Sequence, residues 1–130
     1  MANKYNARKV VTADGEFDSQ NEYRRYQQLR LLEKAGMIED LQRQVPFELI
    51  PVQYESYPRH GKRGQRLKDG QRCIEKKCVY VADFVYTDKE KQKVVVEDTK
   101  SEATKTEAYV IKRKLMLFVH GIRVREVDSA

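Results

Sequence analysis

The sequence has few of the residues that hold disulfide-rich or zinc-binding domains together. Its 130 residues include only two cysteines, Cys73 and Cys78, and only two histidines, His60 and His120. Two thiols alone do not complete a tetrahedral zinc site, and the spacing of the three potential ligands from His60 to Cys78 matches no standard zinc finger. We therefore expect two free thiols, with zinc binding as the less favoured alternative.

Long apolar segments are also missing. The longest runs reach four or five residues, as at 115–119, whereas a transmembrane helix needs about 20. No hydrophobic stretch follows the lysine near the N-terminus, so we expect no secretory signal. These absences predict a cytoplasmic protein without a membrane partner.

Several common enzyme patterns are absent as well. The chain has no glycine-rich phosphate loop, no triad-like order of serine, histidine and aspartate, and too few histidines for a zinc hydrolase. With 40% hydrophobic and 35% charged residues, its 130 residues suffice for one compact domain but not for two. We expect a single domain over residues 1–130.

Positive charge is concentrated in one segment. The formal net charge is +6, and residues 59–77 alone carry an excess of that size, because only Asp69 and Glu75 oppose their basic residues. These basic residues are Arg59, Lys62, Arg63, Arg66, Lys68, Arg72, Lys76 and Lys77. Together with several glycines they predict a flexible basic arm that binds a polyanion, although a solvated loop explains the charge alone equally well.

The N-terminal part predicts a leader followed by a helix. Residues 1–16 are polar with scattered valines, which indicates an irregular leader with a short strand around Val10–Val11. Apolar residues then recur every three positions from Tyr23 to Ala35, as in an amphipathic helix. Ser19 fits the start of this helix and Gly36 its end.

The remainder predicts three strands, a helix and a last strand. Residues 45–54 alternate in polarity, and Pro46 and Pro51 favour a strand at a sheet edge. Residues 77–86 and 93–100 are rich in β-branched residues and, with the turn at 88–91, predict a hairpin. Residues 106–119 predict a second helix that Gly121 ends, and residues 122–127 predict a short strand.

Three charged residues interrupt the valine rows of the predicted hairpin. Asp83 does so on the first strand, whereas Asp98 and Lys100 share one face of the second. A buried carboxylate costs several kcal/mol unless it is paired or binds a metal. Asp83 and Asp98 could hold one divalent ion within reach of Lys100, which suits phosphodiester hydrolysis. The alternatives are a structural ion pair between Asp83 and Lys100, or strand ends that expose all three residues.

These residues resemble the PD-(D/E)XK nuclease superfamily. Its motif is an aspartate followed, at a variable distance, by an acidic residue, any residue and a lysine, which matches Asp83 and then Asp98-Thr99-Lys100. Ala82 replaces the proline of the motif. The resemblance extends over residues 17–127, and segments 17–22, 80–84 and 109–114 resemble a small phage-encoded family within the superfamily, with resolvase-like members.

The resemblance implies an α/β fold with a restriction-endonuclease-like αβββαβ core, in which helices flank a central mixed sheet. It implies an endodeoxyribonuclease of phage or bacterial host cytoplasm, dependent on Mg²⁺ or Mn²⁺ because the candidate ligands are oxygens. The small size and the basic arm favour branched or junction DNA in phage recombination or replication, and a homodimer that makes two cuts. A non-catalytic DNA-binding accessory protein with a nuclease-like fold is the alternative.

The resemblance adds further candidates around the acidic centre. Glu22 matches a helix glutamate that joins the metal site in many members, so Glu22 and Thr99 become further candidate metal ligands and Glu22 a further catalytic candidate. Residues 19–22 also fit a capping box, in which Glu22 satisfies a backbone donor, and the two roles are compatible. Glu97 is the rival of Asp98, although it lies on the opposite strand face unless a bulge intervenes.

Basic residues complete the expected site. Lys62, Arg63 and Arg66 of the basic arm are candidate DNA contacts. Lys112 and Lys114 follow Tyr109 on the second predicted helix and could flank the pocket that a phosphate enters. Solvated side chains on an amphipathic helix are the alternative for both lysines.

Overall fold

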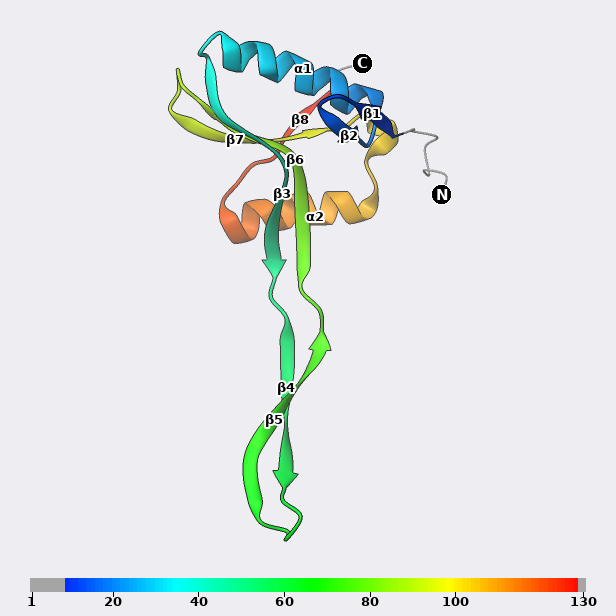
Figure 1. The fold of residues 1–130 in the computed structure, drawn as a ribbon, viewed down its shortest axis with the longest axis vertical. Coiled ribbons are helices and arrows are strands. Elements are labelled where there is room, and N and C mark those ends of the chain that lie inside the picture. Colours follow the sequence, from blue (N-terminus) through cyan, green and yellow to red (C-terminus); the bar gives the residue numbers. More distant parts are fainter. Residues whose placement is uncertain (1–8, 129–130) are drawn as a thin grey trace.

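The computed structural model describes residues 9–128, in which two α-helices lie against a central four-stranded sheet (Figure 1). The sheet order is β3 (Ile38–Ile50), β6 (Cys78–Asp88), β7 (Lys93–Thr99) and β8 (Arg125–Val127). The first three strands are antiparallel neighbours, whereas β7 and β8 run parallel. The expected α/β class, with a mixed central sheet between helices, is confirmed.

Helix α1 (Gln20–Lys34) begins where the sequence predicts. The Ser19 hydroxyl accepts a hydrogen bond from the backbone N–H of Glu22 and so caps the helix. Gly36 follows the last turn with a φ of 77°, a left-handed conformation that glycine adopts without a Cβ clash. Leu29 is fully buried in a cluster with Phe84, which fixes the helix on one face of the sheet.

Helix α2 (Glu107–His120) covers the opposite face, and a short 3₁₀ helix, η1 (Glu102–Thr104), leads into it. Thr106 accepts a hydrogen bond from the Tyr109 N–H at the start of α2, and Gly121 ends the helix with a φ of 66°. On β7, Val95 packs with the α1 cluster and Val96 with the α2 cluster. Alternate residues of one strand thus supply the two faces of the core.

The elements α1, β3, β6, β7, α2 and β8 follow each other in the predicted order of helix, three strands, helix and strand. The predicted bounds of the first strand are wrong, because β3 runs from Ile38 to Ile50 instead of 45–54. Its first half is mostly polar and irregular, with left-handed φ angles at Asp40 and Gln44, and therefore lacks a strand pattern. Pro46 lies in this edge strand, as its position indicates.

The leader is more regular than predicted. β1 (Val10–Thr12) and β2 (Gly15–Phe17) pair as an antiparallel hairpin, which includes the expected short strand. Phe17 is 1% exposed and its ring lies 4.9 Å from that of Tyr23, so the hairpin packs on α1. The first eight residues of the predicted leader lie outside the described part of the chain.

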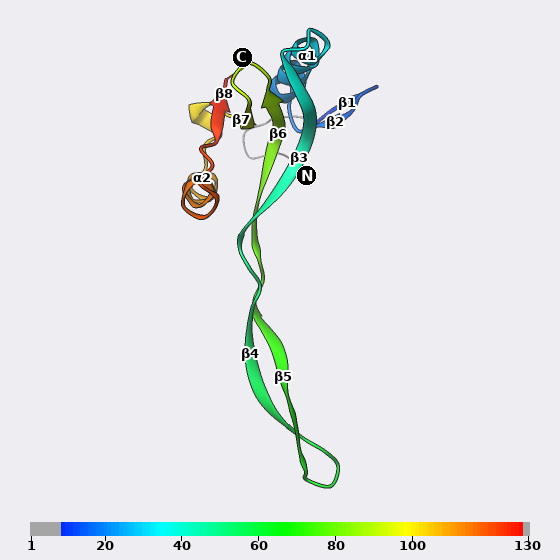
Figure 2. The ribbon, with the colours of Figure 1, turned by 90° about the vertical axis from the view of Figure 1, so that its left-hand side faces the viewer.

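The basic segment 59–77, predicted to be a flexible arm, contains regular β-strands. β4 (Gln53–His60) and β5 (Arg66–Glu75) form an antiparallel two-stranded ribbon, which continues β3 and β6 and projects far from the body (Figure 1, Figure 2). Neither strand has a buried residue, so no apolar period revealed them in the sequence. Cys73 and Cys78 are free thiols. No helix within residues 9–128 has the length and apolar character needed to cross a membrane.

Candidate active site

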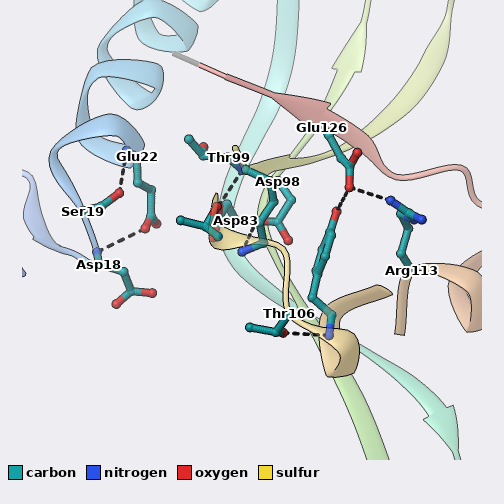
Figure 3. A network of polar contacts seen from close by, with 12 residues as sticks. Asp18, Ser19, Glu22, Asp83, Asp98, Thr99, Thr106, Arg113 and Glu126 are labelled. Carbon is teal, nitrogen blue, oxygen red and sulfur yellow. Dashed lines mark hydrogen bonds and ion pairs between the residues drawn. The ribbon is translucent and has the colours of Figure 1, made fainter. Parts of the chain in front are cut away.

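Asp83, Asp98 and Lys100 lie together where β7 ends. Asp83 of β6 and Asp98 of β7 are each one position beyond the paired residues Phe84 and Glu97, so they are neighbours across the two strands (Figure 3). Lys100 directly follows β7, and its backbone N–H donates to a β8 carbonyl at 3.0 Å. The backbone of three strands therefore fixes the positions of the three residues.

Asp83 is half-buried, and its surroundings disfavour the carboxylate form. Burial raises the pKa of Asp83, the hydrogen bond and charge of Asp98 raise it further, and the charge of Glu22 adds to the effect. The Thr99 N–H donates to Asp83 Oδ2 at 2.9 Å and opposes the rise. The net result is a carboxyl group that holds its proton well above the usual pH range of an aspartate.

Asp98 is only 2% exposed, and its two oxygens differ in their contacts. The Tyr80 hydroxyl donates to Oδ2 at 2.6 Å, whereas Oδ1 is buried and accepts no hydrogen bond from any described residue. Lys100 Nζ lies 3.5 Å from this oxygen and 4.9 Å from the centre of the Tyr109 ring. The ion pair considered between Lys100 and Asp83 is therefore wrong, since Asp98 is the partner of Lys100.

Glu22 approaches the two aspartates from α1. Its Oε2 accepts a hydrogen bond from the Asp18 N–H at 3.1 Å, and burial, followed by the charge of Asp18, raises the pKa of Glu22. The helix-end role considered for Glu22 is thus real, although the donor is Asp18 rather than the cap residue itself. Gln44 Nε2 lies 2.9 Å from Glu22 Oε1 and 3.4 Å from Asp83 Oδ1, so its amide bridges the two carboxyl groups.

A second polar cluster adjoins the aspartates on the α2 side (Figure 3). Glu126 of β8 accepts hydrogen bonds from the Tyr109 hydroxyl at 2.7 Å and from Arg113 Nη1 at 3.0 Å, and Lys105 Nζ lies 3.2 Å away. Burial alone would raise the pKa of Glu126, but these donors lower it below its ordinary value. Glu126 therefore remains ionised and holds Tyr109 against the site.

With this geometry established, the chain can be compared with known proteins. The family DUF1064, described as a protein of unknown function, matches residues 2–127. The chain belongs to the DUF1064 family. No curated protein and no solved structure matches it. For this DUF1064 chain, the chemistry of the site is what indicates a function.

The acidic centre of the DUF1064 chain fits a divalent cation in two respects. A cation would remove the repulsion between Asp83 and Asp98, and it would coordinate the Oδ1 of Asp98, which accepts no hydrogen bond from the described residues. No group of three histidine, cysteine, aspartate or glutamate side chains in the described residues forms a metal site. Mg²⁺ nevertheless suits this centre, because it often binds through one or two carboxylates together with water and substrate phosphates. The Thr99 hydroxyl, buried and without a hydrogen bond to the described residues, lies beside this pair.

Glu97 is separate from the acidic centre. It is fully buried on the α1 side of the sheet, where Arg25 Nη2 donates to its Oε2 at 2.9 Å and the Tyr86 hydroxyl also donates to it. Burial, followed by this hydrogen bond, raises the pKa of Tyr86 to about 12. The structure thus separates Glu97 from Asp98 as the period of two predicts.

The predicted basic contacts are not gathered at this centre. Lys112 and Lys114 form no ion pair with any described residue, and Lys114 is exposed. Lys105 and Arg113 instead supply the ordered positive charge near the aspartates, through Glu126. The other predicted contacts, Lys62, Arg63 and Arg66, lie at the far end of the ribbon (Figure 1).

Three site residues were missed in the sequence. Gln44 lies opposite Asp83, between the register pairs that its neighbours form, but the ribbon inserted between β3 and β6 hides this pairing. Tyr80 lies in a predicted strand, and a tyrosine in a buried row needs a partner for its hydroxyl, which is a usable signal. Glu126 interrupts the last short strand in the way Asp98 interrupts β7, and the same reasoning would have identified it.

Proposed function

We propose that the DUF1064 chain is a divalent-metal-dependent endodeoxyribonuclease of the PD-(D/E)XK type, with Asp83, Asp98 and Lys100 at its centre. The observation that carries the proposal is the buried Oδ1 of Asp98, which accepts no hydrogen bond from the described residues and lies beside Asp83, a carboxyl group with a raised pKa. The element order supports it, because it is the order of a restriction-endonuclease-like αβββαβ core and the motif lies on the β6–β7 hairpin.

Each residue has a defined part in this proposal. Asp83 and Asp98 would hold Mg²⁺ or Mn²⁺, and Tyr80 fixes the orientation of Asp98 through Oδ2. The bound ion supplies an activated water and offsets charge on the phosphate. Lys100 is held near the Tyr109 ring with its ammonium group at the centre, where it can stabilise the same developing charge. Glu22 would either bind the ion directly or help to position Asp83 through the Gln44 amide.

The proposed substrate is branched or junction DNA in phage recombination or replication, in the cytoplasm of the host. Recognition through phosphates and shape suits a protein whose positive charge lies on a projecting ribbon. A homodimer would bring two centres to one junction, which needs two cuts.

DNA cleavage should require a divalent cation, because without one the paired carboxylates would repel the negatively charged phosphate. The measurement incubates linear, flapped, forked and four-way DNA with Mg²⁺ or Mn²⁺ and, in parallel, with excess EDTA. The cation should also raise the melting temperature, since it relieves the repulsion between Asp83 and Asp98. Undiminished cutting in EDTA would refute the proposed centre. DNA binding without cutting under every cation would favour an accessory protein that lacks catalysis.

A further inference from the structure

The β4–β5 ribbon has a strongly basic end. Its distal part, residues 59–68, contains no acidic residue, whereas residues 53–58 and 69–75 contain Glu55, Asp69 and Glu75 but only Arg72 as a basic residue. The distal basic residues, all exposed, are Arg59, Lys62, Arg63, Arg66 and Lys68. The positive charge of the ribbon is therefore concentrated at the end furthest from the body (Figure 2).

The part of the ribbon near the body is held by contacts between its two strands. The Tyr57 ring lies over Gly70, where a Cβ atom would come within 2.3 Å of the ring. The Arg72 guanidinium also lies over the Tyr57 ring, 4.4 Å from its centre. Gln71 Nε2 donates to Ser56 Oγ at 2.7 Å. These contacts hold the two strands of the ribbon together, although the ribbon has no hydrophobic core.

The tip is an ordered turn, and of its cations Arg66 pairs with Asp69. The Gly61 N–H donates to the Gln65 carbonyl at 2.8 Å, and the Gly64 N–H donates to the Gly61 carbonyl at 2.9 Å. Lys62, Arg63 and Lys68 form no ion pair with the described residues. A two-stranded ribbon of this kind adds little to stability. Its free cations are available to a ligand.

The tip lies far from the acidic centre along the strands. Gln44 lies opposite Asp83, and the chain from Gln44 to Arg59 spans up to about 50 Å at about 3.3 Å per strand residue. Duplex DNA rises about 3.4 Å per base pair, so this reach corresponds to about 15 base pairs.

We propose that the ribbon tip is a second DNA contact, which binds the phosphates of duplex DNA about 15 base pairs from the bond that the acidic centre cuts. The proposal rests on the proposed function. Duplex DNA is the occupant that fits, because its major groove admits a two-stranded ribbon and its two phosphate rows match cations spread along the tip. Single strands are held by stacking on aromatic rings, and residues 59–68 contain no phenylalanine, tyrosine or tryptophan.

The test compares a tip variant with a charge-matched control. The tip variant carries Lys62→Gln, Arg63→Gln and Lys68→Gln, and the control carries Lys89→Gln, Lys91→Gln and Lys93→Gln at the β6–β7 turn, where all three lysines are exposed. Binding is measured in EDTA, so that no cutting occurs, with duplexes of about 12 and about 30 base pairs. Melting temperature and circular dichroism establish that both proteins are folded.

The wild type should bind the long duplex at least about tenfold more tightly than the short one. Once the acidic centre is bound to a long duplex, the tip binds the same molecule, so its binding is intramolecular. The tip variant should lose this length advantage, and the slope of log K against log salt on the long duplex should fall by about 2 to 3. The control, and a tip variant that retains charge (Lys62→Arg, Arg63→Lys, Lys68→Arg), should keep the advantage. A tip variant with the full length advantage would overturn the proposal.

Three further outcomes are informative. An equal loss on a single strand of the same length would overturn the assignment to duplex DNA. A protein that shows the length advantage but cuts no DNA with Mg²⁺ or Mn²⁺ would refute the proposed hydrolysis and leave the tip as a DNA contact. A protein that cuts DNA but shows no length advantage would refute the role of the tip and leave the proposed hydrolysis unaffected.

Discussion

Arg25→Ala should lower the free energy of unfolding by about 3 kcal/mol, because it leaves a charge unpaired in the core. The side chain of Glu97 is completely buried and that of Arg25 is 13% exposed, and the pair joins α1 to β7. Without the guanidinium, the Tyr86 hydroxyl would be the one remaining donor to the buried Glu97 carboxylate among residues 9–128. Chemical denaturation followed by circular dichroism measures the loss.

The neighbouring arginine supplies the matched control. Arg24 is exposed on the same helix, and its Nη1 donates to Asn21 Oδ1 at 3.3 Å, so Arg24→Ala should cost under about 0.5 kcal/mol. Adding Glu97→Gln to Arg25→Ala should restore part of the lost stability, since the unpaired charge is then gone. An effect of Arg25→Ala as small as that of Arg24→Ala would show that the pair is not a stabilising link between α1 and β7.

The parts of the fold that bury apolar residues could be predicted from the sequence. The start of α1 at Ser19 and the end of α2 at Gly121 follow from their caps, and the β6–β7 hairpin follows from its valine-rich strands. The ribbon could not be predicted in this way. Its strands bury nothing on either face, so their pairing depends on cross-strand contacts such as Tyr57 with Gly70 rather than on a hydrophobic period.

The candidate site was predictable where a charge interrupts a buried row. Asp98 and Glu97 illustrate the limit of this reasoning, because both are buried and only the strand period assigns them to opposite faces. The position of Gln44 could not be predicted from the strand period, since its place opposite Asp83 depends on the register between β3 and β6. Long-range register is set by the packed sheet and has no local signature in the sequence.

Asp83→Asn should reduce DNA cleavage about a thousandfold or more, because the several kcal/mol that a bound cation supplies would be lost. The same change should alter the pH dependence of stability in EDTA. In the folded wild type the pKa of Asp83 is raised. Above the ordinary aspartate pKa of about 3.9, the folded state therefore binds more protons than the unfolded state. Stability should therefore fall as pH rises from about 5 to about 8, and Asp83→Asn should flatten this fall.

Asp88→Asn is the control for this change, since Asp88 lies on the same strand and its Oδ1 accepts turn N–H groups that an asparagine can also bind. It should leave both cleavage and the pH slope unchanged.

Lys100→Ala should separate catalysis from cation binding at the same centre. Lys100 contributes its ammonium group to the phosphate and no oxygen to the cation, so cleavage should fall about a hundredfold to a thousandfold. The rise in melting temperature with Mg²⁺ should persist, because Asp83 and Asp98 are intact, whereas Asp83→Asn should abolish that rise. Lys93→Ala, which removes an exposed lysine at the start of the same strand, should leave both readouts unchanged. If Lys100→Ala and Asp83→Asn, both shown to be folded by circular dichroism, cut DNA at wild-type rates, then Lys100 and Asp98 form a structural ion pair and this centre is not catalytic.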